Sequence, residues 1–121
     1  MKVDNNKGIE DSIIEVCQDY ENDIYWALTE LNHLLKKYKD RPIKIASITS
    51  CSNVTGIKTP YHEVAKIMHQ NGGFCFVDFA ASAPYVKIDM HPEDPEERLD
   101  AIFFSPHKFL GGPGTCGILV F

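Results

Sequence analysis

Two short apolar segments with an amphipathic helix between them constrain this chain most strongly. Residues 43–49 alternate and are rich in β-branched side chains, and residues 74–77 form a continuous apolar run, so both are predicted to be strands. Between them, Val64, Ile67 and Met68 mark the apolar face of a helix. A strand, a helix and a strand at this spacing form a βαβ unit, which favours a parallel sheet with covered faces.

Residue types at both ends define this helix. Thr59 is a favourable N-cap, and Pro60 fits the first turn. At the other end, Gly72 and Gly73 follow Asn71 and stop the helix. We therefore expect the helix to start at Thr59 and Pro60 and to end at Asn71.

The segments on either side of this unit extend the sheet. Residues 13–17 are apolar and β-branched and predict a first strand, and apolar residues recur every three or four positions from Ile24 to Tyr38, which predicts a helix. Residues 101–104 and 117–121 are two further strands. The glycine-rich loop between them is too short for a crossover helix, so they should pair antiparallel. The expected fold is α/β, with three layers and a mostly parallel sheet that has one antiparallel strand.

Length and composition indicate one soluble domain. The chain has 121 residues, is 44% hydrophobic and 24% charged, and carries a formal net charge of -5. These values fit a globular protein and argue against a general nucleic-acid or anionic-membrane surface. No apolar run approaches the roughly 20 residues of a membrane helix. Four cysteines without a C-x-x-C pair argue against a zinc site and favour the cytoplasm. Residues 1–11 are expected to form a flexible N-terminus.

Polar residues follow the carboxyl ends of three predicted strands. Asn53 lies in the loop after the second strand, Asp78 ends the third, and Ser105, His107 and Lys108 follow the fourth. In open α/β sheets, ligands bind at this edge. We therefore expect three loops that are distant in sequence to converge on one site.

Lys108 is poorly explained as a surface charge. It lies between two hydrophobic runs and precedes four glycines, which allow the backbone to approach a ligand closely. A lysine amine forms a Schiff base with a carbonyl cofactor. Pyridoxal phosphate (PLP) needs such a lysine, a carboxylate at its pyridine nitrogen, and donors for its phosphate. Lys108 fits the first role, Asp78 the second, and Ser105 and His107 the third, and Asn53 could contact the ring.

Three segments, taken as a set, resemble the class V aminotransferase family, which includes cysteine desulfurases. They are Ser52-Asn53-Val54-Thr55-Gly56, Val77-Asp78-Phe79-Ala80, and Ser105-Pro106-His107-Lys108 with its glycines. The resemblance covers residues 13–121 and implies the large domain of a PLP-dependent transferase. It implies that Lys108 is the Schiff-base lysine, that Asp78 is the pyridine partner, and that a homodimer acts on an amino acid. Ser105 and His107 match the phosphate positions, and Asn53 matches a loop asparagine near the cofactor.

Three departures from the family pattern matter. Many relatives have a glutamine that contacts the cofactor's O3′ three residues after the aspartate, where this chain has Ala81. A surface excursion over residues 90–100 enlarges the stretch before the lysine, and its acidic cluster from Glu93 to Asp100 is expected to be a solvated loop. Family members are also several times longer. The expectation is therefore a single partial domain over residues 1–121, the central part of the cofactor-binding large domain, which is inactive alone.

The same residues allow other interpretations. The glycine run lacks the Gly-Lys-Ser/Thr ending of a P-loop, and no further ligand type accompanies His62 and His69 at metal-ligand spacing. Cys51 and Cys116 flank the proposed site, and a reactive role for either requires a lowered thiol pKa. A non-catalytic truncated chain, or a small α/β binding module, is the alternative to an enzyme.

Overall fold

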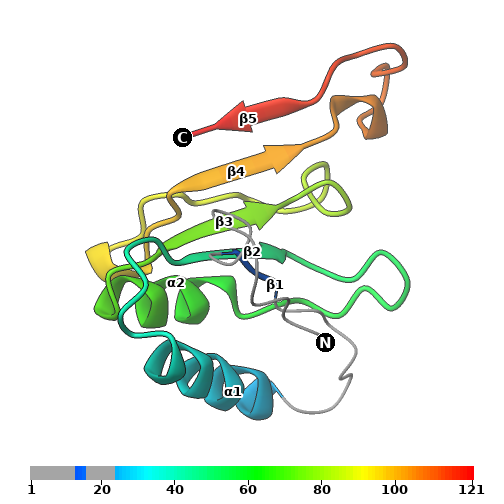
Figure 1. Ribbon diagram of the computed structural model, residues 1–121. Helices are drawn as coiled ribbons and strands as arrows, with labels where there is room; N and C mark the ends of the chain where they lie inside the picture. The colour runs from blue at the N-terminus through cyan, green and yellow to red at the C-terminus, as the bar shows by residue number, and fades with distance from the viewer. Residues whose placement is uncertain (1–12, 16–23) are drawn as a thin grey trace.

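The computed structural model describes residues 13–15 and 24–121, which form a five-stranded sheet with two α-helices on one face (Figure 1). The strands follow one another in sequence order across the sheet: β1 (Ile13–Glu15), β2 (Ile45–Thr49), β3 (Phe74–Asp78), β4 (Ala101–Phe104) and β5 (Ile118–Val120). The helices are α1 (Ile24–Lys37), which precedes β2, and α2 (Tyr61–Gln70), which joins β2 to β3. Two short 3-10 turns complete the fold: η2 (Pro95–Glu97) and η3 (Pro106–Lys108).

The pairing of the strands confirms the predicted topology. β1, β2, β3 and β4 run parallel to one another, and β5 pairs antiparallel with β4, with Phe103 opposite Leu119. The first predicted strand is seen as Ile13–Glu15, while Val16 and Cys17 lie outside the described residues. In the described part of the chain, no helix is long and apolar enough to cross a membrane.

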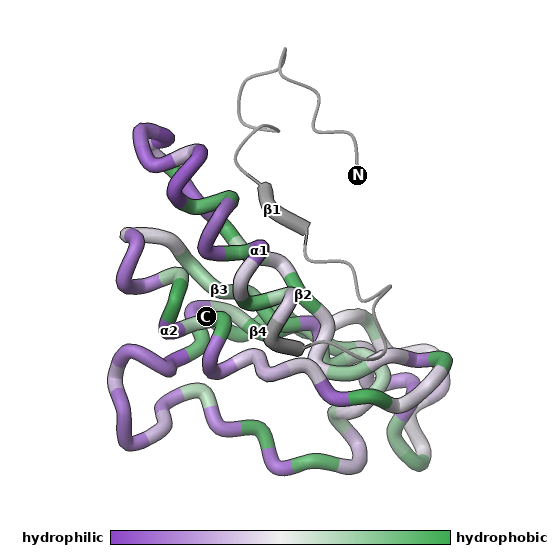
Figure 2. The backbone as a smooth tube through the Cα atoms, turned by 90° about the horizontal axis from the view of Figure 1, so that it is seen from below, coloured by the Kyte–Doolittle hydropathy of each residue, from purple (hydrophilic) through white to green (hydrophobic). Residues whose placement is uncertain are grey.

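The hydrophobic core lies between the two helices and one face of the sheet. Alternate residues of β2 and β3 are buried in it, together with side chains of both helices; they include Ala46, Ile48, Cys75, Val77, Leu31, Leu35, Val64 and Met68. The more hydrophilic stretches of α1 lie on the outside of the fold (Figure 2). The α/β class and the mostly parallel sheet with one antiparallel strand are confirmed, and the described residues form two of the three expected layers.

The start of α2 differs from the sequence prediction. The N-cap position is Pro60, which has no side-chain cap hydrogen bond, and the helix begins at Tyr61. The backbone N–H of Thr59 donates to the carbonyl of Ser50 (2.9 Å), which keeps Thr59 in the loop beside β2. The predicted end is confirmed, because Gly72 adopts a φ of +69° directly after Asn71, in the left-handed region that glycine tolerates.

The segment over residues 90–100 lies largely at the surface, with Glu93 and Glu96 exposed, but Asp100 is an exception to the expected solvation. The Asp100 carboxylate accepts hydrogen bonds from the backbone N–H of Cys75 (2.7 Å) and from Nε2 of His69 (2.9 Å). Lys66 Nζ lies 2.6 Å from a carboxylate oxygen of Asp94. This hydrogen bond raises the pKa of Lys66 and lowers that of Asp94. The acidic residues therefore attach the segment to α2 and to the start of β3.

Replacing Asp100 by Ala should destabilise the fold. The substitution leaves the Cys75 N–H and the ring of His69 without their acceptor. The site is largely buried, since the side chains of Asp100 and His69 are only 14% and 8% exposed. We expect the free energy of unfolding to fall by about 2–4 kcal/mol, measured by denaturant unfolding. Glu93→Ala is the matched control, since Glu93 is exposed and should change stability by less than about 0.5 kcal/mol. Equal stability of the two variants would contradict this role for Asp100.

Candidate active site

The carboxyl ends of β2, β3 and β4 lie at one edge of the sheet, on the right in Figure 1. Thr49 pairs with Asp78, and Asp78 pairs with Phe103. Beyond these pairs, Ser50 N–H donates to the Asp78 carbonyl and Phe79 N–H to the Phe103 carbonyl, both at 2.8 Å. The loops after the three strands therefore start side by side, as the sequence predicted.

A cleft of about 740 Å³ lies at this edge and brings together residues from all three loops. Asn53 comes from the loop after β2, Ser82 from the turn after β3, and Lys108 from η3 after β4. Asn53 and Lys108, two of the predicted site residues, thus line the same cleft. Asp78, Ser105 and His107 are not among its lining residues.

A tight loop holds Asn53 at the mouth of the cleft. The Ser52 hydroxyl accepts hydrogen bonds from the N–H groups of Val54 (3.2 Å) and Thr55 (3.1 Å), and Gly56 has a φ of +74° that closes the turn. Asn53 itself is exposed, and its side chain has no hydrogen-bond partner among the described residues. Its amide is therefore available to a ligand.

Asp78 is the last residue of β3, and one of its two carboxylate oxygens accepts a hydrogen bond. Its Oδ1 accepts a hydrogen bond from the backbone N–H of Ala80 (2.7 Å), which fixes the side chain at the start of the turn. Within the described residues, Oδ2 has no hydrogen-bond partner. One carboxylate oxygen of a half-buried side chain thus remains able to accept a donor.

Lys108 is positioned by η3 and by the glycine-rich loop after it. Its backbone N–H donates to the carbonyl of Ser105 (3.1 Å), while its ammonium group has no hydrogen-bond or ion-pair partner in residues 24–121. Ser105 is the N-cap of η3 but makes no side-chain cap hydrogen bond. Gly112 lies so close to η3 that a Cβ there would overlap the carbonyl group of Pro106. A glycine is therefore required where the loop passes the backbone of η3.

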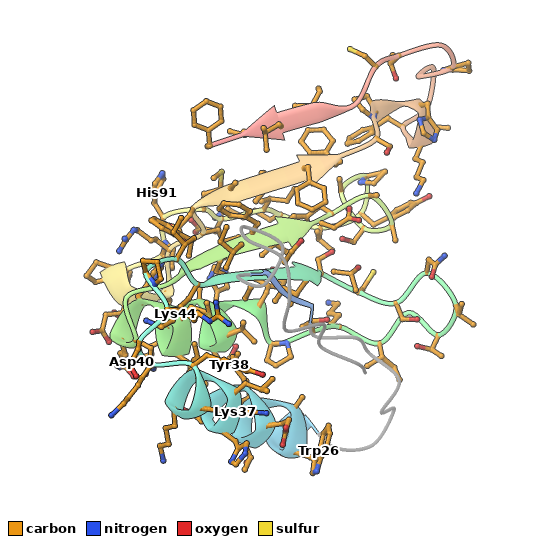
Figure 3. All side chains as sticks on the ribbon, viewed as in Figure 1. Trp26, Lys37, Tyr38, Asp40, Lys44 and His91 are labelled. Atoms are coloured by element: carbon orange, nitrogen blue, oxygen red, sulfur yellow. The ribbon has the colours of Figure 1, made fainter. Side chains whose placement is uncertain are left out.

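The charged residues that line the cleft are all basic, although the chain is acidic overall. Lys58, Lys87 and Lys108 line it, and no carboxylate of the described residues does. By contrast, Lys44, Asp40 and His91 lie toward the opposite edge of the sheet (Figure 3). A lining of three cations without an anion favours a negatively charged ligand.

Sequence reasoning missed a buried pair of hydroxyl groups in the cleft. Ser50 and Ser82 are 3% and 7% exposed, and their Oγ atoms are 2.5 Å apart. Tyr61, also in the lining, has a pKa raised by burial and by the nearby Glu63 and Asp89 carboxylates. Sequence position could have drawn attention to Ser50, which directly follows β2, but no local signal marks Ser82.

Within the described residues, the cysteines and the two histidines of α2 lie in surroundings that indicate no catalytic or metal-binding role. Cys75 is buried in β3, and burial raises the pKa of its thiol to about 12, so it stays protonated at neutral pH. Cys51 is half-buried in the cleft lining and Cys116 is exposed. His62 and His69 face the backbone carbonyls of Glu97 and Glu96. No group of three or more metal-ligating side chains gathers within residues 24–121.

Comparison with known proteins identifies the family. The model of the family described as aminotransferase class-V matches residues 16–121, nearly the whole chain. The chain belongs to the class-V aminotransferase family. Its matched region contains all three segments on which the resemblance in sequence depended.

Several class-V relatives and neighbours in fold resemble the chain. A protein of Halalkalibacterium halodurans described as a probable cysteine desulfurase is 42% identical over 76 residues, which are 63% of this chain and 18% of that protein. A NifS-like protein from Rickettsia africae has a TM-score of 0.66 at 24% identity, over 76% of this chain and 24% of that one. A serine palmitoyltransferase from S. paucimobilis, solved with a bound PLP–myriocin aldimine, has a TM-score of 0.60 at 18% identity, with coverages of 76% and 24%. The chain thus spans about a fifth of the length of its curated relatives.

Gly112→Ala should disturb the site loop of this class-V chain. The added methyl group would overlap the Pro106 carbonyl and displace η3, at a cost of about 1–3 kcal/mol in unfolding free energy. Hydrogen exchange at residues 104–110 should also become faster. Gly117→Ala is the matched control, because its Cβ would meet only the Phe104 carbonyl oxygen at 3.9 Å. If both variants behave like the parent in thermal unfolding and exchange, the close approach at Gly112 is not a constraint.

Proposed function

We propose that the protein is a PLP-dependent enzyme of the class-V group that acts on an amino acid, as an aminotransferase or a cysteine desulfurase-like enzyme. Lys108 is proposed to hold the cofactor through a Schiff base at Nζ. The observation that carries this proposal is the shared cleft: Lys108, whose ammonium has no partner in the described part of the chain, lines it together with Asn53. The family to which residues 16–121 belong supports the same assignment.

The chemistry of the cleft fits PLP. The cofactor combines an aromatic ring with a doubly charged phosphate, and a pocket of about 740 Å³ is within the range of ordinary cofactor sites. The three lysines of the lining provide positive charge for the phosphate and for the carboxylate of an amino acid. Tyr61 and Tyr85 add aromatic surface to the same lining.

The predicted site residues divide the binding task. Asp78 would accept a hydrogen bond from the protonated pyridine nitrogen through its unengaged Oδ2. Ser105, whose hydroxyl is not used to cap η3, and His107 would donate to the phosphate. Asn53, at the mouth of the cleft, would contact the ring or its substituents. These four side chains bind and orient, and only Lys108 is proposed to react.

Lys108 is also the proposed proton carrier. When bound, PLP withdraws electrons from the α-carbon of an amino acid. The Lys108 amine, freed when the substrate amine replaces it, would remove the α-proton as a general base. Asp78 would support this step by keeping positive charge on the pyridine nitrogen. The choice between transamination and desulfuration belongs to residues outside those assigned here.

Borohydride reduction tests the assignment of Lys108. The purified full-length protein, loaded with PLP and reduced, should carry one pyridoxyl adduct, and peptide mapping should locate it on Lys108. Lys108→Ala should lose the adduct and the visible absorbance band. Lys36→Ala is a matched control, since Lys36 is exposed on α1, is not part of the cleft lining, and should leave the adduct in place. An adduct on another lysine, or none, would refute the proposal.

We further propose that this chain is the central part of the cofactor-binding large domain and that the whole protein is a homodimer. The supporting observation is that the chain aligns with only 18% of its curated relative. The rest of such an enzyme would complete the site, since the cleft alone leaves Lys108 and Asn53 exposed.

The 121-residue chain alone should therefore show no catalysis and retain no PLP. After incubation with PLP and dialysis, its absorbance above 380 nm should return to that of a control incubated without cofactor. A band that survives dialysis would show that the chain forms a cofactor site by itself. The Lys108→Ala chain separates specific binding from random reaction of surface lysines.

A further inference from the structure

The Ser50 and Ser82 hydroxyl groups form the most deeply buried polar contact of the cleft. Ser50 directly follows β2, and Ser82 lies in the turn after β3. Backbone hydrogen bonds hold both residues in place: Ser50 N–H donates to the Asp78 carbonyl (2.8 Å), and Ser82 N–H to the Phe79 carbonyl (3.0 Å). The positions of both serines thus depend on the ends of β2 and β3, as does the position of Asp78.

The two hydroxyl groups have one proton more than their mutual contact uses. Each hydroxyl is one donor, and the 2.5 Å bond between the Oγ atoms consumes one of the two protons, whichever residue donates. Neither oxygen has another hydrogen-bond partner in residues 24–121. Buried donors are rarely left unsatisfied in proteins. The pair therefore carries one O–H donor that awaits an acceptor.

That donor belongs to the cleft that Lys108 lines. Ser50, Ser82 and Lys108 all contribute to its lining, and Ala81, next to Ser82, offers only a methyl group. In PLP, the phenolic oxygen is attached to the ring carbon next to the one that bears the aldehyde, and the aldehyde is the group that would react with Lys108. The phenolic oxygen is a hydrogen-bond acceptor that would lie in the cleft with Lys108, and the serine pair provides a donor in the lining of the same cleft.

We propose that the Ser50–Ser82 pair donates a hydrogen bond to the phenolic oxygen of PLP, an inference that rests on the proposed function. Ser82 and Ser50 are positioning residues here. Because the bond would be made to an oxygen with negative charge, it would tighten cofactor binding and draw charge away from that oxygen.

Substitution of the serines by Ala, singly and together, tests the pair in the purified full-length protein loaded with PLP. We expect the Kd for PLP to rise about tenfold when both serines are replaced by Ala, as for loss of one hydrogen bond to a charged group. Each single variant should show a smaller rise, because the remaining hydroxyl keeps a proton that it no longer donates to its partner. The pH midpoint of the visible absorbance should move upward by about one unit, because the phenolic oxygen then holds a neighbouring proton more tightly. Ala81→Gln, added to Ser82→Ala, brings a new amide donor to the cleft and should restore both values in part.

Ser47→Ala is the matched control. Ser47 lies in the middle of β2, is not part of the cleft lining, and should leave the Kd and the midpoint unchanged. If Ser82→Ala fails to fold, Ser82→Cys replaces it, since the thiol keeps the volume and is a weaker donor; its Kd should still rise. A purely structural pair would lower the unfolding temperature while the Kd and midpoint stay at the Ser47→Ala values, and this result would overturn the inference.

The same experiment separates this inference from the proposed function. If the parent protein binds PLP on Lys108 but the serine variants match Ser47→Ala, only the role of the serine pair is wrong. If the parent protein binds no PLP, the proposed function fails, and the inference fails with it.

Discussion

The parallel register of β2, β3 and β4 is the constraint on which the candidate site depends. With Thr49, Asp78 and Phe103 in line across the sheet, the loops that follow these strands leave from one edge. A slip of one residue in β3 would turn Asp78 to the other face and bury Phe76 in place of Val77. Burial of Cys75 and Val77 therefore fixes the register of β3, and the register in turn fixes the face on which Asp78 lies.

At the opposite end of β3, the Asp100 carboxylate holds the strand through hydrogen bonds. The Asp100 carboxylate accepts the N–H of Cys75, and the Asp100 N–H donates to the carbonyl of Cys75 (3.0 Å). His69 Nε2 binds the same carboxylate from α2. One side chain thus connects the start of β4, the start of β3 and the helix between β2 and β3. The acidic excursion can be long because Asp100 returns the chain to the sheet in a defined position.

Much of this arrangement could be predicted because it depends on local patterns. β-branched and apolar runs predicted the strands, and the short glycine loop correctly predicted that β5 is antiparallel. What could not be predicted depends on contacts between distant residues. Ser50 and Ser82 are 32 residues apart and meet only through the register of the strands. Likewise, the acidic side chain of Asp100 predicted exposure to solvent. Its partners on α2 and β3 lie 25 or more residues away, so a local sequence pattern could not reveal them.

The charge of the cleft has consequences beyond simple attraction. The chain carries a net charge of -5, so an anionic ligand is repelled at long range and attracted only near the lysines. At physiological salt the screening length is about 8 Å, so the acidic surface beyond the cleft loses influence at that distance. Lys58, Lys87 and Lys108 are the charged residues of the lining, so a phosphate or carboxylate inside meets cations at close range. Selectivity for anions can therefore reside in this edge of the sheet, although the composition of the whole chain argues for the opposite.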